Sequence, residues 1–178
     1  MKRLFALACL SLMAFAGAAR AGSIGLGVYA GPSIPVLQDD VDRGTMMGVR
    51  VPVKLVPMLA LEPFWASSSL GDKTTDVAGV SYTRQGFDEK AWGVNAMLST
   101  GGPIQFYPFA GVGRTTLQRT GTDLALTTYQ GGIGIGLSPI PSLSLHLRGE
   151  LQAAVDGGTT RKFANVTLGA SYALLRLP

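Results

Sequence analysis

The sequence feature that most constrains the fold is a two-residue hydrophobic period that recurs along the chain. In residues 24–31, the apolar side chains of Ile24, Leu26, Val28 and Ala30 are separated by two glycines and a tyrosine. Successive side chains of a β-strand point to opposite faces, so this period indicates strands with one apolar face and one small or polar face. No segment carries a convincing helical period, and an all-β fold is therefore predicted. The predicted strands are residues 24–31, 47–54, 59–66, 92–99, 104–113, 129–138, 143–152 and 165–174.

The connections between these segments alternate in length. Short turns rich in Pro and Gly are expected at residues 54–57, 100–103 and 138–141. Longer polar loops are expected near residues 33–43, 70–86, 118–124 and 156–162. This alternation predicts eight antiparallel up-and-down strands whose termini both lie on the short-turn side. The loop at 70–86 is the longest, and any partner recognition is expected there.

The distribution of charge indicates which strand face meets which environment. Charged strand residues share their face with many glycines, whereas the opposite face is almost wholly aliphatic. Small residues beside a few large polar groups suit a narrow closed lumen, because about eight strands leave room only for side chains. The aliphatic face would then contact lipid, and closure would satisfy every backbone amide. The sequence thus predicts an eight-stranded antiparallel up-and-down transmembrane β-barrel.

The charged residues of the predicted lumen are expected to form an internal network. Buried charges need partners to offset their desolvation, and polar neighbours on the same face can complete the hydrogen bonds. The alternative is an ion path through the lumen. The predicted network comprises Arg50, Lys54, Glu62, Arg148 and Glu150, and the expected hydrogen-bonding neighbours are Asn95, Gln105, Tyr107, Gln130 and Asn165.

Outward-facing aromatic residues are predicted to form two belts at the membrane interfaces. If the strands are counted alternately up and down, Trp65, Trp92 and Tyr129 fall toward the outer end. By the same count, Phe106 and Tyr172 fall toward the periplasmic end. The alternative is that aromatic residues are simply scattered along the strands, as in any β-protein.

Residues 1–21 have the features of a secretory signal peptide. Two basic residues precede an apolar stretch, and small residues predict cleavage after Ala19-Arg20-Ala21, before Gly22. Three of the 15 Lys and Arg residues lie in this segment, which leaves 12 basic against 11 acidic residues in the rest of the chain. That near balance gives no support for nucleic-acid binding. Cys9, the single cysteine, lies in the same segment, so no disulfide is expected in the chain that follows.

One set of residues invites an enzymatic interpretation. Ser144, His146 and Glu150 contain the groups of a hydrolase, and lipid-modifying enzymes do occur on eight-stranded barrels. However, they follow a short turn on the lumen face, far from where an enzyme of the outer leaflet would act. No catalytic, cofactor or metal site is therefore predicted, since one His and scattered carboxylates do not make a metal cluster.

Four short segments resemble successive strands of small OmpA/OmpX-like outer-membrane β-barrels. They are Pro108–Gly113, Gln130–Gly134, Leu145–Glu150 and Asn165–Tyr172. The resemblance covers residues 22–178, taken as one barrel domain, and marks an architecture rather than an activity. One departure is that such chains usually end on an aromatic residue, whereas this one continues past Tyr172 to Leu177-Pro178.

The resemblance implies a non-enzymatic protein of the outer membrane of a diderm bacterium, supporting envelope integrity or surface interaction through its loops. Expected partners are outer-membrane lipids and lipopolysaccharide, the outer-membrane insertion machinery and an undefined surface ligand. The alternatives are a small porin-like channel, a lipid-modifying enzyme and a soluble secreted barrel.

Overall fold

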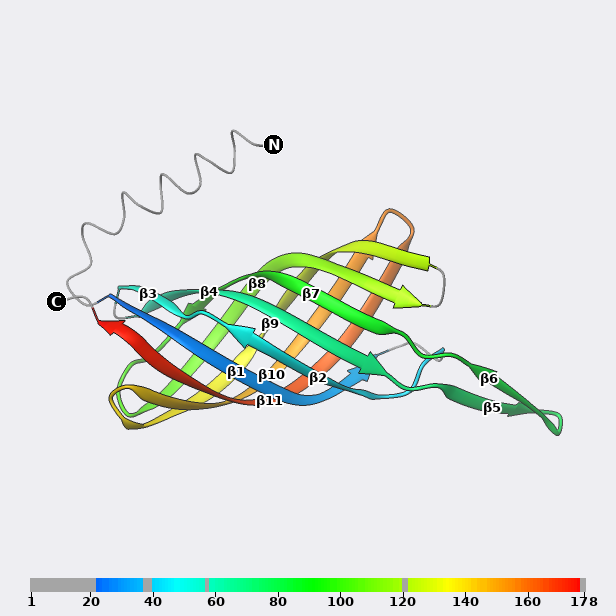
Figure 1. Cartoon of the computed structure of the whole chain (residues 1–178), viewed down its shortest axis with the longest axis horizontal. Coiled ribbons are helices and arrows are strands. Elements are labelled where there is room, and N and C mark those ends of the chain that lie inside the picture. Colours follow the sequence, from blue (N-terminus) through cyan, green and yellow to red (C-terminus); the bar gives the residue numbers. More distant parts are fainter. Residues whose placement is uncertain (1–21, 37–39, 57, 120–121, 177–178) are drawn as a thin grey trace.

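The computed structural model describes residues 22–36, 40–56, 58–119 and 122–176, and every regular element in these ranges is a β-strand (Figure 1). Within those ranges, no helix is long and apolar enough to span a membrane. The strands of the main sheet are β1 (Ser23–Pro35), β2 (Gly44–Arg50), β3 (Val53–Val56), β4 (Leu59–Leu70), β7 (Asp88–Leu98), β8 (Ile104–Arg119), β9 (Thr122–Ile140), β10 (Leu143–Asp156) and β11 (Thr159–Arg176).

These strands form a closed eight-stranded antiparallel barrel, as predicted. Each strand pairs with its sequence neighbour, and β11 returns to pair with β1 from Ser23↔Arg176 to Pro35↔Phe163. β2 and β3 occupy one barrel position, because both pair with β1 on one side and β4 on the other. Closure leaves the barrel without a free edge, so its backbone amides are satisfied internally.

The two ends of the barrel differ, and we name them by their connections. The turn end is where β1 begins, β11 ends and the short turns lie (Figure 1). The loop end carries the other four connections. In the turn between β7 and β8, Gly101 and Gly102 have φ values of 74° and 86°, a left-handed conformation that favours glycine.

Alternate residues face the lumen and the outside, as the two-residue period predicted. Along β7, residues alternate strictly between exposed and buried, with Trp92 and Val94 outside and Gly93 and Asn95 inside. Inward glycines make room for large side chains on the adjacent strand. Tyr29 pairs directly with Gly48, and a Cβ atom at Gly48 would lie 2.6 Å from the tyrosine ring.

Two of the predicted loops are wrong. The segments 118–124 and 156–162 are largely strand, because β8 continues to Arg119, β9 begins at Thr122, and β10 and β11 are joined by Gly157-Gly158. β8, β9 and β11 contain 16, 19 and 18 residues, whereas a membrane crossing needs about 9–11. Their outer parts carry polar residues such as Arg114 and Lys162 on the outward face, and the apolar residues there face the lumen. The predicted pattern of apolar outside and small or polar inside therefore stops, although the hydrogen-bonded ladder continues.

The long connection at 70–86 also contains a strand pair that the sequence period did not reveal. β5 (Lys73–Val77) and β6 (Val80–Arg84) form a separate two-stranded sheet that extends beyond the barrel (Figure 1). Ala78 and Gly79 both have positive φ, at 53° and 82°. This is the pattern of a two-residue type I′ hairpin turn, whose twist matches that of its strands.

Candidate functional site

The lumen is the candidate functional site, and its centre is closed by a buried ion pair. Glu62 on β4 and Arg148 on β10 meet across the barrel. Arg148 donates Nη1–H to Glu62 Oε1 at 2.5 Å and Nη2–H to Glu62 Oε2 at 2.6 Å, and neither side chain is more than 5% exposed. Such a two-pronged, charge-assisted contact is among the strongest polar interactions in proteins. With Arg50, whose Nε lies 3.8 Å from Glu62 Oε2, these residues form the central ion-pair layer.

Aromatic rings and amides surround the two arginines of this layer. The Arg148 guanidinium lies 5.1 Å from the Tyr107 ring centroid and 5.0 Å from that of Phe109, and Arg50 lies 5.4 Å from that of Tyr29. Such stacking favours a desolvated cation. Asn95 donates to Glu62 at 3.4 Å, and Gln130 donates to Asn95 at 2.6 Å. The space left among these side chains is about 10 Å³, which holds at most about one water molecule.

The remaining two charged residues of the predicted network differ in position. Glu150 lines the same small central space as Arg50, Glu62 and Arg148, whereas Lys54 does not. Glu150 accepts a hydrogen bond from Asn165 at 3.1 Å rather than from an arginine. Lys54 lies nearer the turn end, where it lines an open cavity. Gln105 bonds Ser99 and the carbonyl of Gly102, so it stabilises a turn rather than the charge cluster. The structure thus brings together Arg50, Glu62, Arg148 and Glu150, with Tyr107, Asn95 and Gln130 as neighbours.

A second polar group, which the sequence reasoning missed, lies on the loop side of the central layer. Glu89 is 1% exposed and accepts hydrogen bonds from Gln152 and, at 3.5 Å, from Thr115. Thr128 donates to Thr115 at 2.5 Å. The available signal was the alternation of Glu89, Ala91 and Gly93, which places Glu89 on the lumen face of a strand that begins earlier than predicted.

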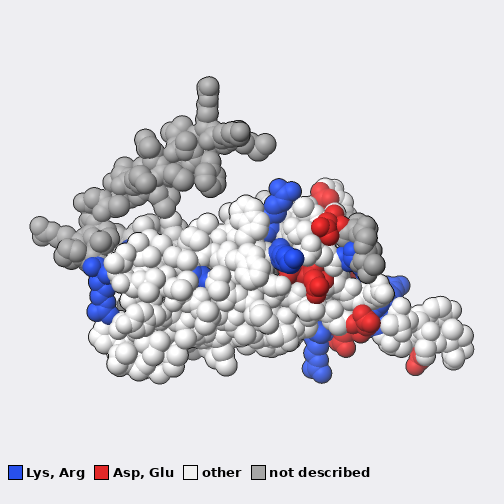
Figure 2. Space-filling view, viewed as in Figure 1, with Lys and Arg blue, Asp and Glu red and all other residues white. Residues whose placement is uncertain are grey.

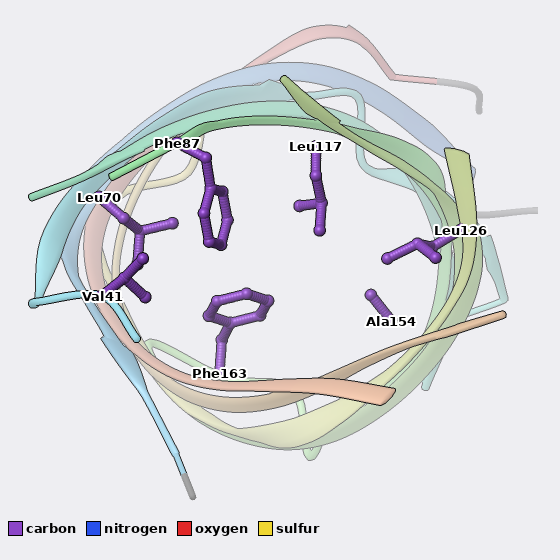
Figure 3. Packing of buried hydrophobic residues seen from close by; sticks show 7 residues of the cluster. All are labelled: Val41, Leu70, Phe87, Leu117, Leu126, Ala154 and Phe163. Carbon is purple, nitrogen blue, oxygen red and sulfur yellow. The ribbon is translucent and has the colours of Figure 1, made fainter. Parts of the chain in front are cut away.

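An apolar cluster fills the lumen at the loop end, and we call it the apolar plug. Seven side chains from around the wall point inward and meet near the axis (Figure 3). The Phe87 and Phe163 rings pack edge to face with centroids 6.4 Å apart. Arg161 donates from Nη1 to both carboxylate oxygens of Asp40, at 2.6 and 2.7 Å, and its guanidinium lies over the Phe87 ring. The plug comprises Val41, Leu70, Phe87, Leu117, Leu126, Ala154 and Phe163.

The turn end is open, in contrast to the rest of the lumen. A cavity of about 400 Å³ lies between the central ion-pair layer and the turn-end mouth, and we call it the vestibule. Glu62, Tyr107 and His146 lie at its inner end. Lys54 on β3 and Arg176 on β11 also line it, at the end where the barrel opens.

The residues of the hydrolase alternative are not brought together. His146 Nε2 lies 2.7 Å from Ser171 Oγ, and its Nδ1 lies 3.1 Å from the Tyr107 hydroxyl. Ser144 instead bonds Ser138 at 2.8 Å, and Glu150 bonds Asn165. Among the residues that the structure describes, no group of three His, Cys, Asp or Glu side chains is placed to hold a metal ion.

The outer surface carries the aliphatic and aromatic residues of the predicted lipid face. Trp65 and Trp92 are directly paired on β4 and β7 and are 45% and 57% exposed. Tyr129, Phe106 and Tyr172 also face outward. On the face shown in Figure 2, the charged residues gather toward the two ends, and the surface between them is nearly free of charge. Outward cations lie beside the aromatic residues. Arg114 pairs directly with Trp92. Ala153 on β10 pairs with Tyr129 on one side and with Lys162 on the other, so Lys162 lies two strands from Tyr129.

The predicted signal peptide and its cleavage residues Ala19 and Ala21 lie outside the described residues. Gly22 is described and lines the vestibule. The signal peptide therefore stays a prediction from the sequence.

Comparisons with known proteins give structural neighbours but no sequence match. No protein-family model and no curated protein matches the sequence. The fold is similar to that of Neisserial surface protein A, with 11% identity, a TM-score of 0.63 and coverage of 85% of this chain and 96% of that one. It is also similar to a major outer membrane protein from Thermus thermophilus, with 11% identity, a TM-score of 0.58 and coverage of 86% and 99%. For the N-terminal β-barrel domain of Pseudomonas aeruginosa OprF, the identity is 12%, the TM-score 0.52 and the coverage 85% and 99%.

These neighbours establish the fold. The chain has the architecture of small eight-stranded outer-membrane barrels of the OmpA/OmpX type, as the four short sequence segments suggested. At identities of 11–12%, the comparisons say nothing about what the lumen or the loops of this chain bind.

Proposed function

We propose that this protein is an integral outer-membrane barrel that acts as a closed, non-enzymatic scaffold and presents its loop end to the cell exterior. The observation that carries this proposal is the inverted arrangement of polarity. Glu62 and Arg148 are buried and paired at the barrel centre, while Leu26, Val28 and Ile133 are 49%, 57% and 56% exposed on the outside. A soluble barrel would place the ion pair outside and the aliphatic residues inside.

The closed lumen favours a scaffold over the alternative of a channel. An ion crossing the barrel would have to pass the central ion-pair layer, where about 10 Å³ is free, and then the apolar plug. The plug offers no polar group to replace the hydration shell of an ion. The free-energy cost of moving an ion through it is therefore high. Two successive obstructions of different chemistry support a barrel that does not conduct.

The loop end is the natural place for interaction with other molecules in this proposal. The β5–β6 hairpin extends beyond the barrel and exposes Val80 and Tyr82, which are 52% and 57% exposed. Surface loops held by a rigid barrel are where recognition residues usually lie. Contribution to envelope integrity through contacts with lipopolysaccharide and other outer-membrane lipids is the second part of the proposal, and the outward cations beside the aromatic residues support it.

Fractionation of the source cells tests the location. We expect the protein in the outer-membrane fraction, with faster gel migration before boiling than after, because a closed barrel resists detergent until it is heated. A protein found in the aqueous fraction, with identical migration before and after boiling, would contradict the proposal.

Single-channel recording tests the closed lumen. We expect no stable current from the refolded protein in planar bilayers. The matched variant removes both large rings of the plug, Phe87→Ala with Phe163→Ala, and we expect it to remain closed because the central ion-pair layer is still present. Steady, discrete currents from the wild-type protein would show that the channel alternative is correct.

A further inference from the structure

We infer that the vestibule at the turn end is a binding site for a small organic anion with a short apolar portion. This inference goes beyond the proposed scaffold function, which uses only the outer surface and the loop end. The vestibule encloses about 400 Å³, within the range of about 300–1,000 Å³ that is usual for small-molecule sites. It is a one-ended pocket, because the central ion-pair layer closes its inner end.

The charge of the lining favours an anion. Among the described residues that line the vestibule, the charged side chains are Lys54, Arg176 and Glu62. The Glu62 carboxylate is already held by two N–H groups of Arg148 at 2.5 and 2.6 Å, so its charge is compensated on the far side of the cavity wall. The two cations at the turn end therefore give the vestibule a net positive field that a bound anion would match.

Hydrogen-bond directions at the inner end also favour an acceptor ligand. Arg148 Nε can only donate, so the Tyr107 hydroxyl oxygen accepts at 3.0 Å. We assign the hydroxyl hydrogen to the bond with His146 Nδ1, 3.1 Å away, which corresponds to the Nε2–H tautomer of the imidazole. In this assignment His146 Nε2 carries the hydrogen and donates to Ser171 Oγ, 2.7 Å away. The Ser171 oxygen is thus used as an acceptor, and its own hydrogen remains to be donated into the vestibule.

The same chain of hydrogen bonds argues against a Ser171–His146 catalytic pair. A general base must accept the hydroxyl hydrogen through an unprotonated nitrogen. In the assigned tautomer Nε2 donates to Ser171, so His146 does not accept the serine hydrogen, and Ser171 is available as a binding group. Apolar side chains complete the wall, including Ala60 and Met97, and they suit a short hydrocarbon or aromatic portion rather than a fully polar solute.

Titration of the full chain, refolded in a zwitterionic detergent, tests this site by NMR. The probes are benzoate, phenyl phosphate and the uncharged benzyl alcohol, which share one ring and differ in the head group. We expect benzoate or phenyl phosphate to shift amide signals of Gly25, Ser144 and Ser171, and benzyl alcohol to bind at least about tenfold more weakly, because it lacks a charge-assisted hydrogen bond. The tighter of the two anions identifies the head-group chemistry.

Two variants link the binding to the named residues. Lys54→Gln is expected to lower the affinity for the tighter-binding anion about tenfold, and Ser171→Ala to lower it by a smaller factor. The control is Lys90→Gln, on the outer face of β7, which is expected to leave the affinity unchanged. Equal affinity for benzyl alcohol and the anions would overturn the inference, as would unchanged binding in Lys54→Gln. Shifts confined to lipid-facing residues would also overturn it, and because signal mapping uses the wild-type protein, this outcome does not depend on how the variants fold.

Discussion

At the scale of single residues, the barrel is organised around one ion pair whose partners are 86 positions apart in sequence. In the folded barrel, Arg148 and Glu62 contact each other instead of water. Arg148 also donates to the Tyr107 hydroxyl and lies over two aromatic rings. Removing one partner leaves an uncompensated buried charge, which is more costly than removing both. The residue types predicted this network, but not its membership, because strand alternation assigns a face and leaves the height and rotamer of each side chain open.

The ion pair gives the first prediction. Glu62→Gln or Arg148→Met alone is expected to lower the free energy of unfolding by about 3–5 kcal/mol, and the double variant by less than the sum of the two. Urea unfolding of the refolded barrel measures this, with Arg84→Met on the exposed β6 strand as the control. If the single changes were as mild as the control, the pair would have no stabilising role.

At the scale of elements, neighbouring strands fit together through pairs of one large ring and one glycine. The directly paired residues are Tyr29 with Gly48, Phe64 with Gly93, Tyr107 with Gly134, and Phe109 with Gly132. At Gly48, Gly93 and Gly134, a Cβ atom would lie within 2.9 Å of the paired ring, so the absence of a side chain makes room for that ring in the narrow lumen. The glycine-rich face was visible in the sequence, but the pairing was not, because it depends on strand register.

The second prediction concerns these pairs. Gly48→Ala is expected to destabilise the barrel by about 1–3 kcal/mol, because the new methyl group would meet both the Trp65 carbonyl oxygen and the Tyr29 ring. Gly149→Ala is the control, since a Cβ atom there has no neighbour within 4 Å. Equal unfolding midpoints for the two variants would show that the close approach of Tyr29 to Gly48 does not matter.

The third prediction concerns the β5–β6 hairpin, which belongs to a separate sheet. Replacing residues 73–84 with a two-residue Asn-Gly turn is expected to leave heat-modifiable migration intact and to change the unfolding free energy by less than about 0.5 kcal/mol, as is usual for changes away from a packed core. A large loss of stability would mean that the hairpin is part of the barrel's folding unit. The sequence pointed to a long loop here, because exposed polar strands lack the apolar face that makes a strand recognisable.

At the scale of the whole molecule, three features determine behaviour: an aliphatic exterior, a lumen closed twice and a vestibule open at one end. The strand period was sufficient to predict the exterior and the closed barrel, since both follow from which residues alternate. The apolar plug was not predicted, because its members come from seven different segments and meet only once the barrel is closed. The lengths of β8 to β11 were underestimated because, near the loop end, the apolar residues of these strands face the lumen and the outward residues are polar, the reverse of the pattern used to recognise the strands.

A membrane-spanning barrel requires that the outer surface contacts lipid, and the chain contains two natural probes of this contact. Its two tryptophans, Trp65 and Trp92, are paired with each other and both face outward. We predict that, after refolding into bilayers, their fluorescence is quenched by lipids brominated on the acyl chains, more strongly by bromines near the head groups than by those near the bilayer centre, and is poorly quenched by aqueous iodide. Strong quenching by iodide with none by brominated lipids would contradict a membrane-spanning barrel.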